Sequence, residues 1–317
     1  MWYNRSCLRK EGDFTLVRTE KEKRLLYEKN EEVRKQQSYW VVKRNDLITH
    51  SRYSLTLSQQ RLLLFLISKI APYDDIENEY RVKIKDIIDV CEYDKTSGTY
   101  YKLIKRDLLV LRNSAIWMET ARGLETIGWL SKAILIKPQK ETDYQEICFK
   151  FDGGLEPYLF QLKSFYTQYN LENIITLSHK YSLRLYEYLM SYANLMYVIV
   201  SVDDLKVRLD AKSYSKYNHF KERILKPSIE DINSKTNIFI EYDELKTGKA
   251  ITKIAFYIWG VNEESKDYTI EDMRIRAGIK ANVDRRIIKD KKQKIDKEKM
   301  IKVNGEITAQ LSLFEDS

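Results

Sequence analysis

The stretch FKERILKPSIEDINSKTNIFIEY, residues 220–242, decides the fold. Its apolar residues recur at helical spacing, which predicts a long basic helix over Tyr214–Asn233. Pro227 lies inside this helix and removes one backbone donor, so we expect a kink there. A strand at Ile238–Tyr242 follows directly. The residues expected on the buried face of the helix are Tyr217, Phe220, Ile224, Ile229 and Ile232.

The flanking sequence completes a recognisable order of elements. On the N-terminal side a helix opens at Leu177-Ser178, a short strand covers Tyr197–Val202, and a small helix covers Asp203–Leu209. On the C-terminal side Thr252–Trp259 pairs with the first strand as a hairpin around the turn LKTGKA. Helix, strand, helix, turn, helix and hairpin follow one another, which is the plan of a winged-helix domain.

The same order occurs about 120 residues earlier in the chain, a spacing that indicates a duplicated domain rather than a solenoid. Ile104-Lys-Arg-Asp-Leu-Leu109, for example, matches Phe220-Lys-Glu-Arg-Ile-Leu225. The elements expected here are a strand at Tyr39–Val42, a helix N-capped by Ser58 and ended by Ala71-Pro72, a strand at Tyr80–Val82, helices at Lys85–Cys91 and Thr99–Arg112, and a hairpin of Ile116–Glu119 with Trp129–Ile136.

We therefore predict an α+β fold of two tandem winged-helix domains related by internal duplication. The alternative is two unrelated α+β units whose similarity is accidental. The expected parts are a charged helical arm at 1–37, a first winged-helix domain at 38–160, a second at 161–262 and a basic, flexible tail at 263–317. The arm has too thin an apolar face to fold alone, and the segment Met273–Lys302 carries twelve basic and four acidic residues.

Composition narrows the chemistry. The chain has 317 residues, of which 43% are hydrophobic and 32% charged, and a net charge of +8 that favours a polyanionic partner. Its three cysteines show no CxxC spacing, its three histidines are far apart, and its ten glycines form no phosphate-binding loop. No apolar run is long enough for a membrane span or a signal peptide. We thus expect a cytoplasmic protein without catalytic residues, metal or cofactor.

The long helix of the second unit carries side chains suited to DNA. Arg can bridge guanine, Asn can bridge adenine and Glu can accept from cytosine in a major groove, while Lys and Ser hold phosphates. The turn of the following hairpin is a basic wing tip. The candidate DNA-binding residues are Lys212, Ser213, Ser215, Lys216, Asn218, His219, Glu222, Arg223, Lys246 and Lys249. A solvated charged face on an ordinary surface helix is the alternative interpretation.

The matching helix of the first unit is basic but has fewer side chains that discriminate between bases. Its expected core stripe is Tyr101, Ile104, Leu108 and Leu111. Its candidate DNA-binding residues are Lys102, Lys105, Arg106 and Arg112. We interpret this unit as a phosphate-binding or dimerisation surface.

Two segments carry a resemblance to a known family. VVKRNDLITHSRYSLTLSQQRLLLFLISKI, residues 41–70, and the stretch 220–242 resemble the initiator replication proteins of plasmids, the Rep_3 type. The resemblance covers about residues 40–260 and implies binding to repeated origin sites called iterons, with the second domain in the major groove. It also implies a monomer that opens the origin and recruits host replication proteins, and a homodimer that represses the initiator's own promoter.

The resulting interpretation is a non-enzymatic, sequence-specific DNA-binding initiator of plasmid replication. One alternative is a double winged-helix transcriptional repressor with no replication role, which shares every DNA-binding feature. Another is a rolling-circle nickase with a tyrosine nucleophile. Such an enzyme needs metal-binding histidines close together, which this chain does not have.

The chain ends with QLSLF followed by Glu-Asp-Ser. The pentapeptide resembles the motif with which bacterial replication proteins bind the sliding clamp of the replicative polymerase. A short tethered segment can place Leu and Phe in an apolar pocket at small entropic cost. Docking of the terminus on the protein's own second domain is the alternative. The expected clamp-binding residues are Gln310, Leu311, Ser312, Leu313 and Phe314.

Overall fold

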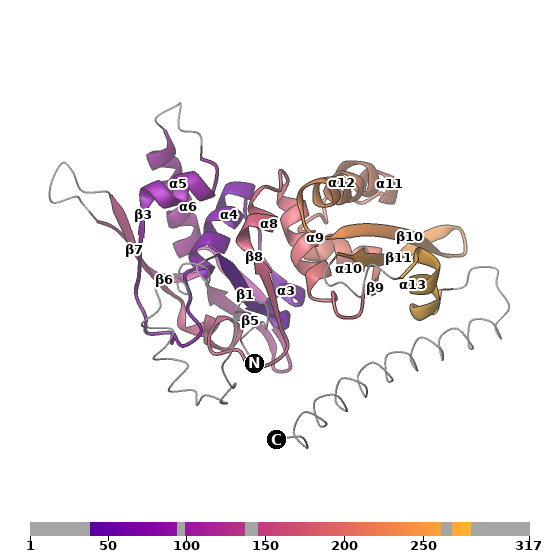
Figure 1. Cartoon of the computed structure of the whole chain (residues 1–317), viewed down its shortest axis with the longest axis horizontal. Helices are drawn as coiled ribbons and strands as arrows, with labels where there is room; N and C mark the ends of the chain where they lie inside the picture. The colour runs from indigo at the N-terminus through magenta and orange to yellow at the C-terminus, as the bar shows by residue number, and fades with distance from the viewer. Residues whose placement is uncertain (1–38, 94–98, 137–144, 261–267, 280–317) are drawn as a thin grey trace, which may run out of the picture. The chain divides into compact units, whose positions relative to one another are not determined.

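The computed structural model describes residues 39–93, 99–136, 145–260 and 268–279 (Figure 1). The elements as far as residue 136 are β1 (Trp40–Arg44), α3 (Asn45–Thr49), β2 (Ser51–Arg52), α4 (Leu57–Ile67), β3 (Tyr80–Lys83), α5 (Ile84–Val90), α6 (Tyr100–Asn113), β4 (Ala115–Thr120), β5 (Gly123–Gly128) and β6 (Leu130–Ile136). The next are β7 (Glu146–Phe151), a 3₁₀ turn (Gly153–Leu155), α7 (Glu156–Leu159), β8 (Tyr166–Asn170), α8 (Leu171–Ile175), α9 (Lys180–Met190), β9 (Tyr197–Ser201) and α10 (Val202–Arg208). The last are α11 (Tyr217–Phe220), a π-helical stretch η3 (Lys221–Leu225), α12 (Lys226–Lys235), β10 (Phe239–Thr247), β11 (Ala250–Trp259) and α13 (Ile270–Arg276).

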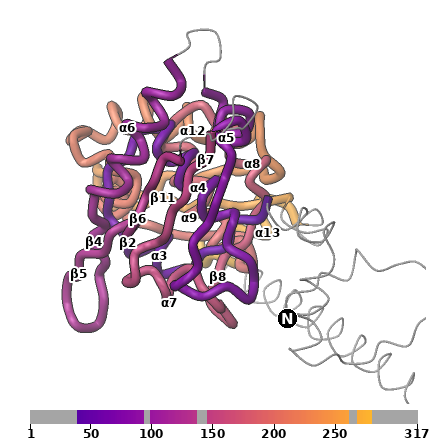
Figure 2. Tube along the Cα trace, turned by 90° about the vertical axis from the view of Figure 1, so that its left-hand side faces the viewer, coloured from indigo at the N-terminus to yellow at the C-terminus, as the bar shows by residue number. Residues whose placement is uncertain are grey.

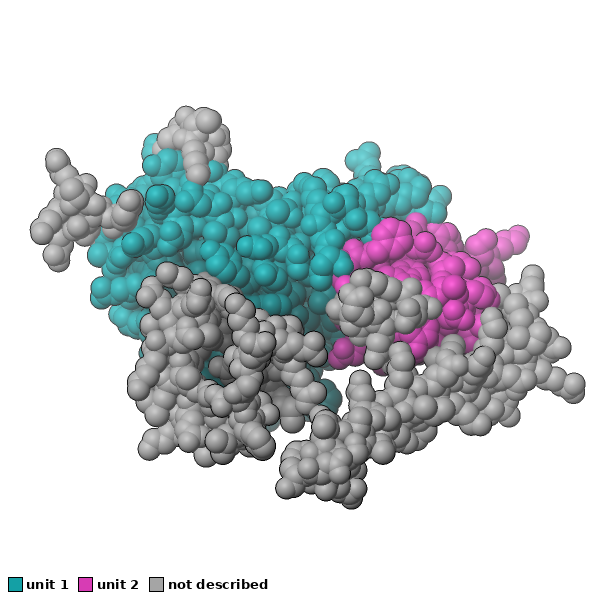
Figure 3. Space-filling view, viewed as in Figure 1, with its two compact units in different colours: residues 1–191, 202–237 teal, residues 192–201, 238–317 magenta. Residues whose placement is uncertain are grey.

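The chain divides into two compact units (Figure 3). Unit 1 contains residues up to 191 together with 202–237, and unit 2 contains residues 192–201 and those from 238 onward. The described residues of unit 1 form three antiparallel sheets, with strand orders β1-β8, β2-β4-β5 and β3-β7-β6. In the described part of unit 2 there is one antiparallel sheet, with strand order β10-β11-β9.

Helix α4 is the central buried helix of unit 1. Its residues from Gln59 to Ile67 are all buried, and it packs against α5, α6 and α9. The predicted N-cap at Ser58 is wrong. Thr56 is the cap, because its hydroxyl accepts from the Gln59 backbone N–H while the Gln59 side chain accepts from the Thr56 N–H, which forms a capping box. The helix also ends at Ile67, ahead of the predicted stop at Ala71-Pro72.

The hairpin of the first unit differs from the prediction. Strand β4 pairs with β5, from Thr120 opposite Gly123 to Ala115 opposite Gly128, and the predicted partner segment Trp129–Ile136 instead forms β6, which pairs with β7. Figure 2 shows the hairpin projecting from the unit. Most residues of β5 are exposed, so the strand lacks the alternation of buried and exposed residues that marks a strand in sequence.

The long helix predicted for the second winged-helix domain is one helical run with an interruption. It begins at Tyr217 rather than Tyr214, and α11 passes through the π-helical stretch η3 into α12. Pro227 has no N–H to give to the carbonyl four residues earlier, so the regular hydrogen-bond ladder cannot continue through it. The irregularity expected at Pro227 therefore takes the form of a π-helical stretch just before the proline. Helix α12 packs against α9.

In the part of unit 2 that the structure describes, helix α13 packs on the sheet. Met273 of α13 is fully buried and packs with Met196, Ala255 and Tyr257. Strand β11 starts at Ala250, two residues before the predicted start at Thr252. A flexible tail was predicted for residues 263–317, but α13 within that segment is a packed helix with its own capping box at Thr269. In the described part of the chain, no helix has the length and apolar character that crossing a membrane requires.

Candidate nucleic-acid interface

The helical run from α11 to α12 has one buried and one exposed face. Phe220, Ile224, Ile229 and Ile232 are buried as predicted, Tyr217 is half-buried, and Leu225 adds a further fully buried side chain. All eight candidate side chains in and before this run are exposed: Lys212, Ser213, Ser215, Lys216, Asn218, His219, Glu222 and Arg223. Burial of one apolar face thus leaves the polar face in solvent, where another molecule can contact it.

Asn218 and Arg223 are free to bind a partner. Among the described residues, the side chains of Asn218 and Arg223 have no hydrogen-bond or ion-pair partner. Glu222 differs, because its carboxylate lies 2.7 Å from the Lys226 ammonium in an exposed ion pair. Such surface pairs contribute little stability, so Glu222 can exchange this partner for another at small cost.

The turn that leads into α11 is fixed by Lys206 of α10. The Lys206 side chain is buried, and its ammonium donates to the Ser215 carbonyl oxygen at 2.9 Å. The same ammonium lies 5.8 Å from the centroid of the Phe220 ring. A second contact holds the turn, because the Ala211 N–H donates to the Lys206 carbonyl at 2.7 Å. The exposed side chains of this turn therefore stand on a backbone with little freedom.

In unit 2 the hairpin of β10 and β11 ends in an exposed basic turn. Lys246 and Lys249 are both exposed, and Gly248 between them has a φ of +63°, a conformation that glycine adopts without steric cost. A register shift separates Leu245 from Lys246, and the hydroxyls of Thr247 and Thr252 are 2.8 Å apart across the hairpin. The turn is therefore well defined and presents two cations to solvent.

Helix α6 carries the candidate cations of the first unit. Ile104, Leu108 and Leu111 are buried as predicted, and Tyr101 is half-buried. The candidate side chains Lys102, Lys105, Arg106 and Arg112 are all exposed.

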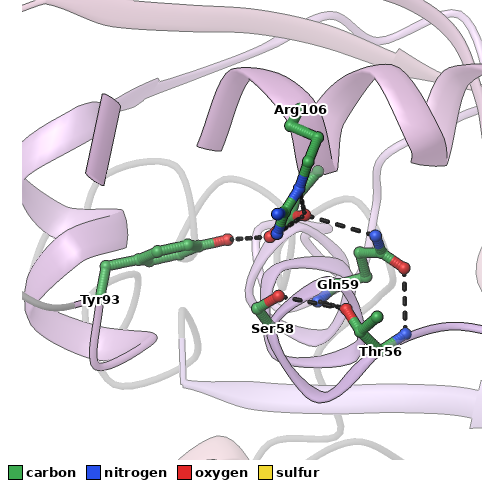
Figure 4. Close-up of polar contacts among 6 residues, drawn as sticks. Thr56, Ser58, Gln59, Tyr93 and Arg106 are labelled. Carbon is green, nitrogen blue, oxygen red and sulfur yellow. Dashed lines mark hydrogen bonds and ion pairs between the residues drawn. The ribbon is translucent and has the colours of Figure 1, made fainter. Parts of the chain in front are cut away.

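Arg106 is held in place by a carboxylate that the sequence analysis did not single out (Figure 4). Its guanidinium donates through Nε and Nη2 to Asp107 Oδ1, at 3.1 and 3.0 Å. Asp107 is fully buried and also accepts from the Tyr93 hydroxyl at 3.0 Å and from Gln59 Nε2 at 3.3 Å. Burial and the neighbouring Asp107 raise the pKa of Tyr93, so its hydroxyl remains a donor. The signal in the sequence was an aspartate three residues after Ile104, on the apolar side of the helix.

Known proteins match this arrangement in both sequence and fold. Residues 40–190 match the first winged-helix domain of the initiator replication proteins, and residues 201–258 match the second. The chain belongs to this family. The two winged-helix domains predicted from the repeated order of elements are confirmed.

One relative and one solved structure show how far the likeness extends. A replication initiation protein of Escherichia coli is 28% identical over 231 residues, which cover 69% of each chain. The structure of the Pi initiator protein in complex with iteron DNA aligns with a TM-score of 0.58 and 22% identity, covering 72% of this chain and 99% of that one. The structural match supports the fold of this initiator.

The structure places the candidate residues of the initiator in three groups: the turn and run around α11, the tip of the β10–β11 hairpin, and α6. The candidate clamp-binding residues, Gln310, Leu311, Ser312, Leu313 and Phe314, lie outside the described residues. The folded chain adds the contact of Asp107 with Gln59 and Tyr93, which joins three separate segments.

Proposed function

We propose that this initiator binds repeated sites at a plasmid origin and reads their sequence with the helical run from α11 to α12. The observation that carries the proposal is the pair Asn218 and Arg223, which are exposed and have no side-chain partner among the described residues. Amide and guanidinium groups make bidentate hydrogen bonds to adenine and guanine in the major groove. The Pi initiator, which shares the fold, was solved with iteron DNA, and this supports the same kind of site for the present chain.

The remaining cations have a supporting role in the proposal. Lys246 and Lys249 at the hairpin tip and the basic side chains of α6 bind phosphates, which fixes the position on the duplex without reading its sequence. A net charge of +8 strengthens association with any duplex and makes it sensitive to salt. The first domain either adds backbone contacts or joins two subunits.

The proposal extends to the partners and the mode of action. The protein acts without catalysis, opens the origin as a monomer in the cytoplasm, and represses its own promoter as a homodimer. It recruits host replication proteins, among them the sliding clamp through Gln310–Phe314. The clamp motif supports a replication role over that of a simple repressor, because a repressor has no use for a polymerase clamp.

A nuclease footprint on the DNA that flanks the gene tests the proposal. We expect protection of several direct repeats, with each protected site in the same orientation. Protection of a single inverted repeat and of nothing else would instead favour the repressor. Incubation with supercoiled origin DNA tests the non-enzymatic part: a covalent tyrosyl–DNA adduct would establish the nickase, whereas intact supercoiled DNA agrees with the proposal.

A further inference from the structure

A small, mostly buried cavity lies in unit 1, and none of its lining residues is a candidate DNA-binding residue. It is lined by side chains from β1, α3, α9 and α10, together with residues that precede α4 and β6. The lining residues on which its charge and hydrogen bonding depend are Lys43, Tyr53, Trp129, Arg184, Glu187 and Arg208. Nothing in the proposed function uses this cavity.

Two of the lining residues have an N–H donor that finds no acceptor among the described residues. Trp129 is fully buried, and among the described residues its indole Nε1 has no hydrogen-bond partner. The same holds for Nε of Arg208. A buried donor without an acceptor loses its hydrogen bonds to water without compensation, and native proteins rarely leave one. Two such donors in the lining of one cavity therefore indicate an acceptor other than the described residues.

The charges that line the cavity favour an anion as that acceptor. Three lining residues are cations and one is a carboxylate, and that carboxylate is already engaged: Lys43 Nζ lies 2.6 Å from Glu187 Oε1, and the Tyr169 hydroxyl donates to the same oxygen. This leaves the guanidinium groups of Arg184 and Arg208 as net positive charge. Buried charge is costly unless it is compensated.

The contacts that the two arginines make with the rest of the chain do not compensate their charge. Arg184 is 7% exposed, donates Nη1 to the Tyr53 carbonyl at 2.8 Å and lies 4.0 Å from the centroid of the Tyr53 ring. Arg208 lies 5.3 Å from the Tyr188 ring centroid. Carbonyl and ring contacts orient a guanidinium, but neither supplies a full negative charge.

We propose that this cavity binds one small inorganic monoanion of the size of chloride, which accepts hydrogen bonds from Trp129 Nε1 and Arg208 Nε. The cavity holds about one water-sized particle, so organic carboxylates and phosphate are too large. Because Trp129 precedes β6 and Arg208 ends α10, the anion links two segments of unit 1 that are far apart in the sequence.

Chloride-35 NMR of the full-length protein tests the proposal. Exchange with a protein site broadens the chloride signal, and we expect this broadening for the wild type and its loss in Arg208→Gln and Trp129→Phe. Bromide should reverse the broadening by competition, whereas glutamate at equal concentration should not, because it does not fit. Arg122→Gln is the matched control, since it removes an exposed arginine from the β4–β5 turn and should leave the broadening intact.

A variant could lose chloride binding because it fails to fold, so a second measurement uses the wild type alone. Bromide is soaked into crystals of the wild-type protein, and its anomalous signal locates the ion without any substitution. A peak within hydrogen-bond distance of Trp129 Nε1 and Arg208 Nε supports the proposal. An ordered water with no anomalous signal at that position overturns it, as does equal chloride broadening in the wild type and in folded Arg208→Gln.

Discussion

Arg274 of α13 binds Asp243 of β10 through two parallel hydrogen bonds, from Nε to Oδ2 at 2.7 Å and from Nη2 to Oδ1 at 2.8 Å. The Tyr257 hydroxyl donates to the same carboxylate at 2.8 Å. The hydrogen bonds from Arg274 are the main cause that lowers the pKa of Asp243 below its usual value of 3.8. This bidentate ion pair joins the last described helix to the sheet of unit 2, and its contribution to stability depends on pH.

Replacing Asp243 should weaken unit 2 above pH 4 and have little effect in strong acid. A carboxyl group whose pKa is lowered by folding stabilises the folded state above its unfolded pKa of 3.8. That stability is lost as the pH falls through the lower folded value. We expect Asp243→Asn to cost about 1 kcal/mol at pH 7, once solvent screening of this partly exposed pair is allowed for.

Urea unfolding of the wild type and Asp243→Asn at a series of pH values measures this difference. Glu241→Gln is the matched control, because Glu241 is an exposed carboxylate on the same strand with no side-chain partner among the described residues. A gap between wild type and Asp243→Asn that stays constant into strong acid would show that the ion pair is not its cause.

Asp107→Ala should destabilise the protein far more than Arg106→Ala. The aspartate is fully buried, and its removal leaves the Tyr93 hydroxyl and the Gln59 amide without their acceptor. We expect a loss of about 3 kcal/mol in the free energy of unfolding for Asp107→Ala. Arg106 has a side chain that is 57% exposed, so its loss should cost less than about 1 kcal/mol.

Denaturant unfolding and DNA binding together separate the two roles. If Arg106 contacts a phosphate, Arg106→Ala should lower affinity for every duplex and reduce the slope of log affinity against log salt by about 1. Equal unfolding free energies for the two variants would contradict the idea that Asp107 is the buried support of the exposed cation.

The structure shows which features a sequence can reveal. The core positions Phe220, Ile224 and Ile232 followed from local helical spacing, because a helix that buries one face repeats its apolar residues. Strand β5 left no such pattern, since it lies mostly in solvent and is defined by its pairing with β4. The N-cap at Thr56 required the reciprocal bond with Gln59, and Ser58 two residues on was an equally suitable residue type.

Some features of the candidate site can likewise be predicted from the sequence and others cannot. Asn218 and Arg223 are exposed because they lie opposite the buried face, so the sequence was sufficient to predict their exposure. The buried contacts that support Arg106 could not be predicted from the sequence. Gln59, Tyr93 and Asp107 lie in separate segments and meet only in the packed structure. The interruption before Pro227 was foreseen as a kink, but its π-helical form depends on how the run packs.

Arg223→Ala and Lys249→Ala should affect DNA binding in different ways. Loss of a bidentate contact to a base should reduce discrimination between the correct and a mismatched site by about 1–3 kcal/mol. Loss of a phosphate contact should weaken binding to all duplexes and reduce its salt dependence. Titrations of specific and random duplexes at several salt concentrations measure both effects.

A variant outside the candidate groups provides the baseline for this comparison. Arg81→Ala removes an exposed cation from β3 and should change neither discrimination nor affinity beyond the effect of net charge. Should Arg223→Ala lose affinity equally for specific and random duplexes, the assignment of Arg223 to base reading is wrong.

Leu313→Ala combined with Phe314→Ala should abolish binding to the sliding clamp while leaving the affinity for origin DNA unchanged. The five residues from Gln310 to Phe314 combine an amide for directional hydrogen bonds with apolar side chains that can fill a pocket. Ordering so short a segment costs little entropy, so a few buried side chains are enough for measurable affinity. The three residues that follow, Glu-Asp-Ser, are polar and give the segment no further apolar surface.

Calorimetric titration of the purified clamp with the full-length protein measures this binding, and a mobility shift on origin DNA checks that the variant is intact. Asp316→Asn serves as the matched control, because it changes the same terminus outside the five expected clamp-binding residues. We expect it to bind the clamp within about threefold of the wild type, a difference below 1 kcal/mol. Wild-type protein that gives no binding heat, or a double variant that binds as well as the wild type, would remove the clamp from the list of partners and return the repressor to consideration.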